Sequence, residues 1–371
     1  MSEVLRALSA YLVNLGGEFS RGWSRFWFEP RPPTTLGMIR ICTGLVLLYV
    51  HLTTLPWLQD IVGPEAWIDQ QATRELTELP NSLGQKLEQR ADQYAAALGA
   101  EGLDDVRRHI ASQVEWSRWY AISVWRWVQD PTAIWVGHGL FIVALFAFTL
   151  GLFSRVAAVL VWYGHLSYIQ RGYLVWYGMD AILLMLTFYL MFAPIGGALA
   201  LDCLRRRRTG EPVNWFGQPA WTVTVVTRLI QIHMCIVYLC AGISKLQGPT
   251  WWNGTATWIT MNTYEFLLFD MRWLGTWPDL AWQVICTSFT YATLIFEIGF
   301  CFCVWSRRLR PIVLFAALLL HAGIGAFMGL TSFGLIMLTA CLSFVEPAGM
   351  QWFVSRLWPG TQTSPPVPPT S

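Results

Sequence analysis

The stretch IWVGHGLFIVALFAFTLGL occupies residues 134–152 and contains no aspartate, glutamate, lysine or arginine. A helix needs about 20 mostly apolar residues to cross the hydrocarbon core of a bilayer, so this stretch predicts a transmembrane helix. Seven further mostly apolar stretches lie on either side of it, near residues 36–56, 156–170, 179–199, 222–244, 281–304, 311–328 and 331–346. The sequence therefore predicts an all-α polytopic membrane protein with about eight transmembrane helices.

The composition excludes a water-soluble globular protein. Of the 371 residues, 54% are hydrophobic and 13% are charged, whereas a soluble domain carries about 25% charged residues. The net charge of +2 gives no reason to expect nucleic-acid binding. The eight cysteines lie in or beside apolar segments and form no CxxC motif, so we expect neither a disulfide framework nor a metal site.

The arginines indicate how the chain is oriented in the membrane. Short cytoplasmic loops carry an excess of lysine and arginine. If the N-terminus is cytoplasmic, the inner segments hold most arginines, while the short outer loops hold only Arg171, Lys245 and Arg272. Eight spans return the C-terminus to the same side. We therefore predict an integral multi-pass protein of the plasma membrane, or of a bacterial inner membrane, with both termini in the cytoplasm.

Three segments flank or interrupt the transmembrane domain, which we place at residues 36–346. In residues 1–35, apolar side chains recur every three or four positions, which predicts an amphipathic helix on the cytoplasmic membrane surface. A helix packed on the protein's own cytoplasmic face fits this pattern equally well. Residues 57–131 form an extracytoplasmic loop whose helical spacing predicts a helical cap, and residues 347–371 form a cytoplasmic tail that we expect to be disordered.

Ionisable side chains inside spans are energetically costly and commonly mark function. They are Arg40, His51, His138, His165, Asp180, Arg228, His233, Glu297 and His321. Glu297 lies deep in its span and needs a partner, for which Arg40 and Arg228 are candidates. Several of these residues also have purely structural interpretations. Arg40 can extend to the headgroups, Asp180 can cap its helix, and the histidines can form ordinary hydrogen bonds.

Lys245 differs from the other cations because the chain holds only two lysines among its 25 basic residues. Lysine can lose its proton when it is desolvated, whereas a guanidinium cannot. A lysine beside Trp251 and Trp252 therefore has the chemistry of a base. The alternative is a lysine that extends to the outer membrane interface, and spacing alone favours that alternative.

The stretch around Lys245 also resembles a known family. Ala241-Gly242-Ile243-Ser244-Lys245-Leu246, followed by tryptophan and glycine, is similar to the hallmark of the HTTM domain, which is the membrane domain of vitamin K-dependent gamma-carboxylase and of many bacterial proteins. Further similar features are Tyr177-Gly178-Met179-Asp180, Leu201-Asp202, Glu297-Ile298-Gly299 and His321. The resemblance covers roughly residues 30–345.

The resemblance implies a quinol enzyme. In the carboxylase, reduced vitamin K is oxygenated to an epoxide, and the strong base so formed removes a proton from a glutamate that then adds carbon dioxide. The family lysine, which starts this chemistry as a neutral amine, matches Lys245, and a later histidine matches His321. Reduced vitamin K or menaquinol is then the expected cofactor. The residues expected to support its binding are Trp251, Trp252, Arg40, Arg228, Glu297, Asp180 and Tyr177.

Two departures from the carboxylase leave the function open. The stretch Gln170-Arg171-Gly172-Tyr173-Leu174 lacks the histidine that the carboxylase has shortly before its Tyr-Gly pair, and no large lumenal domain follows the last span. Quinol chemistry is therefore expected with or without glutamate carboxylation. The alternative is a non-catalytic maturation factor that docks a secreted protein or peptide through residues 57–131, with a transporter or lipid-handling activity as a third hypothesis. In each case the bilayer is a partner.

Overall fold

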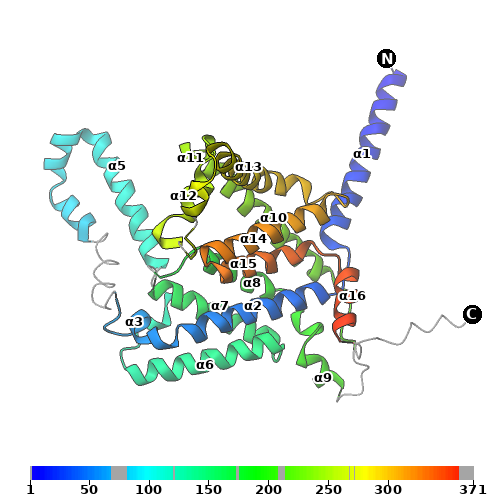
Figure 1. Cartoon of the computed structure of the whole chain (residues 1–371), viewed down its shortest axis with the longest axis horizontal. Coiled ribbons are helices and arrows are strands. Elements are labelled where there is room, and N and C mark those ends of the chain that lie inside the picture. The colour runs from blue at the N-terminus through cyan, green and yellow to red at the C-terminus, as the bar shows by residue number, and fades with distance from the viewer. Residues whose placement is uncertain are drawn as a thin grey trace, which may run out of the picture. The chain divides into compact units, whose positions relative to one another are not determined.

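The computed structural model describes residues 2–67, 82–119, 122–172, 175–207, 214–266, 268–270 and 272–358 (Figure 1). The described residues are helical apart from turns and connections, and no β-strand occurs among them. An isolated β-bridge joins Arg31 and Ala220. The predicted all-α class is therefore confirmed.

The longer helices carry most of the apolar sequence. They are α1 (Ser2–Phe28), α2 (Thr34–Thr53), α5 (Ala91–Trp119), α6 (Pro131–Leu150), α7 (Ser154–Arg171), α8 (Gly178–Met191), α10 (Trp221–Lys245), α13 (Asp279–Cys303), α14 (Arg310–Met328), α15 (Thr331–Cys341) and α16 (Pro347–Leu357). The shorter helices are α3 (Leu58–Val62), α9 (Leu201–Arg207), α11 (Pro249–Trp252) and α12 (Ala256–Met261). The 3₁₀ turn used below is η4 (Ile195–Gly197).

Five of the described helices are long and apolar enough to cross a membrane, namely α2, α6, α10, α13 and α14. A sixth candidate is the pair Thr331–Phe344 and Pro347–Leu357, whose two parts meet at a bend of 120°. The stretch at 179–199 forms only the 14-residue α8, because Pro194 follows soon after it. The stretch at 156–170 lies in α7, whose polar residues, including Arg155, His165 and Gln170, lower its hydropathy. The chain is thus an integral membrane protein with five or six candidate spans in its described part, and the count of eight stays a prediction.

Two compact units divide the chain. Unit 1 comprises residues 1–46, 147–158 and 185–371, and unit 2 comprises residues 47–146 and 159–184. In unit 1, α10 packs along α13 and α14 packs along α15. Glycines permit both approaches: a Cβ at Gly242 would lie 2.7 Å from Ile298 Cγ1, and a Cβ at Gly334 would lie 2.7 Å from the backbone oxygen of His321.

The terminal segments differ in part from the sequence predictions. Helix α1 covers most of residues 1–35 and exposes an apolar series, which is Tyr11, Leu15, Phe19, Trp23 and Phe28. Its C-terminal end is held to α10, where the Thr224 hydroxyl donates to the carbonyl of Glu29.

The expectation of disorder over 347–371 is wrong for its first part, because Met350 and Val354 become buried as α16 forms. Residues 359–371 lie outside the described residues. The same holds for residues 68–81 of the predicted outer cap, and the placement of this cap outside the membrane stays a prediction.

Candidate functional site

Lys245 and Glu297 form an ion pair between α10 and α13. Lys245 Nζ lies 2.9 Å from Oε1 and 2.8 Å from Oε2 of Glu297, so the amine contacts both carboxylate oxygens. The lysine side chain is 27% exposed and the glutamate side chain 11%. The predicted need of Glu297 for a partner is thus confirmed, but the partner is neither Arg40 nor Arg228. The Lys245 side chain thus reaches the carboxylate of a neighbouring helix.

Local sequence explains how the pair forms. Gly242 precedes Lys245 by one helical turn and lets α10 approach α13 at Ile298, the residue after Glu297. Helix α10 ends at Lys245, and Gly248-Pro249 then begins α11. A larger residue at 242 would separate the two helices at the level where their charges meet.

The two tryptophans of α11 lie differently around the amine. The Trp251 ring centroid is 5.5 Å from Lys245 Nζ, a distance at which an ammonium is attracted to the ring face. Trp252 donates its indole N–H to the Leu246 carbonyl at 2.7 Å and leaves most of its ring exposed. Trp251 therefore belongs to the surroundings of the amine, whereas Trp252 holds the turn after α10.

His321 belongs to a second polar contact along α10. Its Nε2 lies 2.7 Å from the Tyr238 hydroxyl, which also lies 3.6 Å from Cys341 Sγ. The rings of Phe296 and Phe300 pack against Tyr238, at centroid distances of 5.3 and 4.2 Å. Tyr238 precedes Lys245 by seven residues, so the two side chains share a face of α10 about 10 Å apart along its axis. Sequence reasoning missed Tyr238, although a hydroxyl on the same helical face as Lys245 was a usable signal.

Arg40 and Arg228 do not take part in the Lys245–Glu297 pair. Arg40 is fully buried and donates to the carbonyls of Ile195 and Leu199, at 2.5 Å each. Arg228 lies 17 residues before Lys245 in the continuous helix α10, which is about 25 Å along the helix axis. Neither arginine therefore acts as a supporting charge for Lys245 through direct contact.

Asp180 and Tyr177 belong to a polar cluster in unit 2. Asp180 Oδ2 accepts the backbone N–H of Tyr177 at 3.0 Å, as a helix cap does, and its Oδ1 lies 3.5 Å from His165 Nε2. His165 Nδ1 in turn lies 3.2 Å from His51 Nε2. A fourth helix contributes His138, whose Nδ1 lies 2.6 Å from the Tyr168 hydroxyl.

His51, His138 and His165 were expected to form ordinary hydrogen bonds near helix ends, and the structure places their polar contacts within one group. His51, His138 and His165 are all fully buried, and their rings pack within one cluster. A signal was present in the sequence. If successive spans alternate in direction, the end of α2, the start of α6, the end of α7 and the start of α8 lie at one membrane face. The remaining span histidine, His233, contacts the Tyr189 hydroxyl at 3.1 Å.

Apolar helices with compensated charges between them define an integral membrane protein that holds polar sites inside its helical bundle. The family can be named as well. The HTTM domain matches residues 96–349, which is more than half of the chain, so the chain belongs to the HTTM domain family.

One curated relative is the sporulation-delaying protein SdpB of Bacillus subtilis (strain 168). It is 27% identical over 123 residues, which correspond to 33% of this chain and 38% of SdpB. The aligned region thus spans well under half of either protein. No solved structure matches the chain.

Proposed function

We propose that unit 1 contains an acid–base site that removes a hydroxyl proton from a lipid-soluble quinol, with Lys245 as the base. The observation that carries this proposal is the two-oxygen contact between Lys245 Nζ and the Glu297 carboxylate. The carboxylate lies within proton-transfer distance of the amine, and an isolated lysine at a membrane interface would have no such partner.

The pair supplies the proton chemistry. When the Lys245 ammonium passes its proton to Glu297, a charged pair becomes a neutral amine beside a neutral carboxyl group. The neutral amine can then accept a hydroxyl proton, and the resulting ammonium is again paired with a group that can become its counter-ion.

The surroundings of Lys245 fit a flat aromatic alcohol. The Trp251 ring faces the amine and offers a stacking surface, while the lysine and the carboxyl group accept or donate hydrogen bonds to a hydroxyl. Reduced vitamin K and menaquinol have this combination of ring and hydroxyl groups, and such a quinol supplies electrons for the reduction of oxygen. His321, held by Tyr238, is proposed as a hydrogen-bonding residue further along the same helical face. The proposal covers the quinol step and does not include glutamate carboxylation.

The proposed membrane arrangement has eight spans with both termini in the cytoplasm. In this arrangement α10 ends on the outer side, so Lys245 lies near the outer end of the bundle. A quinol that diffuses laterally in the bilayer would then reach the amine between the helices.

The test is quinol-dependent oxygen consumption by the purified protein in lipid. We expect Lys245→Ala and Lys245→Arg both to lower the rate by about 100-fold or more, because arginine keeps the charge but cannot deprotonate. Glu297→Gln should also lower it, since the amide cannot take the proton. Lys86→Ala is the matched control, because Lys86 is the other lysine of the chain and is exposed. If the wild type consumes no oxygen above the lipid blank with either quinol, the enzyme proposal is wrong.

A docking function is the second candidate. It is favoured by two exposed tryptophans at the ends of the loop 57–131, Trp67 and Trp127, because exposed aromatic side chains are typical of protein interfaces. Photo-crosslinking from position 127 in cells would test it. A crosslinked secreted peptide that disappears with Trp67→Ala supports docking, and adducts with lipid alone contradict it.

A further inference from the structure

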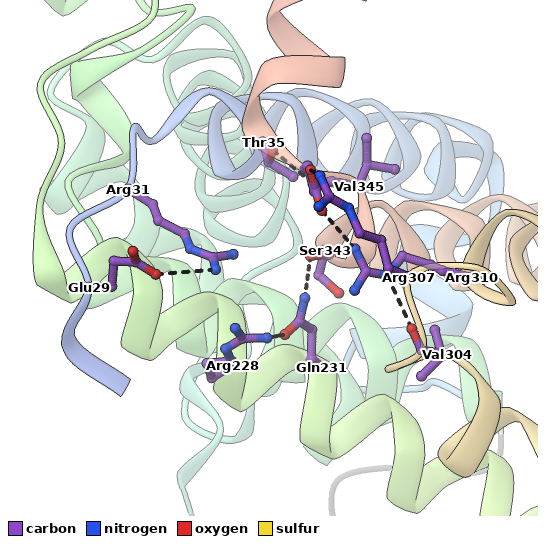
Figure 2. A network of polar contacts seen from close by, with 11 residues as sticks. Glu29, Arg31, Thr35, Arg228, Gln231, Val304, Arg307, Arg310, Ser343 and Val345 are labelled. Carbon is purple, nitrogen blue, oxygen red and sulfur yellow. Dashed lines mark hydrogen bonds and ion pairs between the residues drawn. The ribbon is translucent and has the colours of Figure 1, made fainter. Parts of the chain in front are cut away.

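Four arginines of unit 1 gather where the end of α1, the first third of α10, the α13–α14 connection and the start of α16 meet (Figure 2). They are Arg31, Arg228, Arg307 and Arg310, and the carboxylates paired with them are Glu29 and Glu346. Within this group the positive charges exceed the negative ones by two. This arginine cluster is separate from the Lys245–Glu297 pair, because Arg228 lies about 25 Å away along α10.

Arg228 has only neutral partners in the described part of the chain. Its Nε donates to the Phe26 carbonyl at 3.1 Å and its Nη1 donates to Gln231 Oε1 at 2.9 Å. Gln231 is itself fixed, since its amide donates to the Ser343 carbonyl at 2.6 Å (Figure 2). The guanidinium is therefore held in a defined orientation by neutral acceptors, and no carboxylate of the described residues forms an ion pair with it.

The neighbouring charges add repulsion. Arg31 and Arg310 belong to the same group of positive charges as Arg228 (Figure 2). Glu29 is loosely paired with Arg31 at 3.8 Å, and Glu346 is shared between Arg310 at 3.3 Å and Arg307 at 3.8 Å. An additional anion placed among Arg31, Arg228 and Arg310 would relieve this repulsion.

Aromatic rings and accessibility indicate the nature of that anion. The Arg228 guanidinium lies 4.2 Å from the Phe26 ring centroid and 5.7 Å from that of Trp305, which is the mixture of cation and aromatic ring common at the headgroup level of a membrane. The Arg31 and Arg310 side chains are 29% and 23% exposed, so an anion can reach them. Guanidinium groups bind phosphate oxygens through paired hydrogen bonds, and basic pockets between membrane helices bind anionic headgroups.

We propose that the arginine cluster binds the phosphate group of an anionic phospholipid, with Arg228 at its centre and Arg31 and Arg310 at its sides. The orientation that places the arginines in the cytoplasm would put this site at the inner leaflet, where anionic lipids carry the negative surface potential. The bound headgroup would join the end of α1 to α10 and to the α13–α14 connection. This inference is independent of the quinol proposal.

Native mass spectrometry of the full-length protein tests the site. The purified chain is equilibrated with equal amounts of dioleoylphosphatidylglycerol and dioleoylphosphatidylcholine, which share a phosphate but differ in net charge. We expect the anionic lipid to be retained preferentially, and Arg228→Gln to weaken that preference by about tenfold, the effect of one charge-assisted contact. Arg31→Gln should act in the same direction, and it is a milder change because Arg31 is partly exposed and lies 3.8 Å from its carboxylate partner Glu29.

Arg272→Gln is the matched control, because it removes one positive charge from an exposed arginine that is paired with Asp270 elsewhere. Circular dichroism verifies that each variant is folded. Equal retention of the two lipids, or an unchanged preference in both Arg228→Gln and Arg31→Gln, would overturn the proposal. In a parallel arm the lipids are replaced by inorganic phosphate. If phosphate alone binds as tightly as the anionic lipid and displaces it, the ligand is a free anion and the lipid assignment is wrong.

Discussion

At the scale of single residues, the buried charges are compensated by contacts of different kinds. Arg40 donates hydrogen bonds to backbone carbonyls around η4. The chain is not α-helical after Pro194, so these carbonyls have no partner within a helix. Lys245 forms an ion pair with the Glu297 carboxylate, and a carboxylate can accept and release a proton whereas a backbone carbonyl cannot. The kind of partner therefore separates a structural cation from one with acid–base chemistry.

Arg40→Met should destabilise unit 1. The substitution leaves the carbonyls of Ile195 and Leu199 buried without their donor, which costs about 3 kcal/mol of the free energy of unfolding. Denaturant titration in mixed micelles measures this loss. Arg307→Met is the control, because the Arg307 side chain is 87% exposed, and its stability should match the wild type. Equal stability of Arg40→Met and the wild type would contradict the structural role.

The exposed connection before α13 offers a pH-dependent contact. Arg272 donates to Asp270 from its backbone N–H, Nε and Nη2, and these hydrogen bonds lower the pKa of Asp270 from 3.8 to about 2. Because the folded-state pKa is depressed, the contribution of this pair is complete above pH 3.8 and is lost as the pH falls through about 2. In a carbon-13 NMR titration, Arg272→Gln should return the Asp270 midpoint toward its ordinary value. An unchanged midpoint would show that the arginine is not the cause.

At the scale of elements, glycines set the distances between helices that carry the polar contacts. Gly242 brings α10 against α13 beside the Lys245–Glu297 pair, and Gly334 brings α15 against α14 at His321. Not every glycine has this role, since a Cβ at Gly299 in α13 would meet nothing within 4 Å. The close approaches at Gly242 and Gly334 therefore lie at levels where polar side chains meet.

Gly242→Ala should separate α10 from α13, because its new Cβ would lie 2.7 Å from Ile298 Cγ1 and 3.2 Å from the Ile298 backbone nitrogen. We expect a loss of about 1–3 kcal/mol, as for other overpacked interfaces. Gly299→Ala is the matched control and should be neutral or slightly stabilising, because alanine has the higher helix propensity. Unfolding in mixed micelles compares the two. The prediction fails if Gly242→Ala is as stable as Gly299→Ala.

At the scale of the whole molecule, the number of spans decides on which side of the membrane the C-terminus lies. The five helices that meet the length and hydropathy requirements leave α7, α8 and the bent pair of α15 and α16 undecided. If all of these cross the membrane, the chain has eight spans and both termini lie on one side. If only the five cross, the termini lie on opposite sides.

Reporter fusions after residues 128, 247, 307 and 358 distinguish these arrangements. The eight-span arrangement predicts an outer location for the fusions after 128 and 247, and a cytoplasmic location for those after 307 and 358. The physical reason is that the arginine-rich connections resist translocation. A fusion after residue 358 that reports the outer side would exclude the eight-span arrangement, whereas the fusion after residue 247 tests the proposed orientation of Lys245.

Much of the fold follows from local sequence. Apolar stretches of about 20 residues became helices because a backbone without water must satisfy its own hydrogen bonds. The scarcity of lysine marked Lys245, and the depth of Glu297 in its span marked a need for a partner. These are properties of a residue and its neighbours in the chain, so they can be recognised from the sequence alone.

Only the tertiary structure decided which side chains meet. Glu297 is 52 residues from Lys245. Neither segment indicates by itself that Glu297 pairs with Lys245 and not with Arg40 or Arg228. The close approach of α10 and α13 at Gly242 places Lys245 beside Glu297. In the same way, four helix ends that meet bring together His51, His138, His165 and Asp180. Composition and hydropathy thus determined that this chain is a helical membrane protein. Packing determined its polar sites, because the cost of burying a charge depends on partners that are distant in sequence.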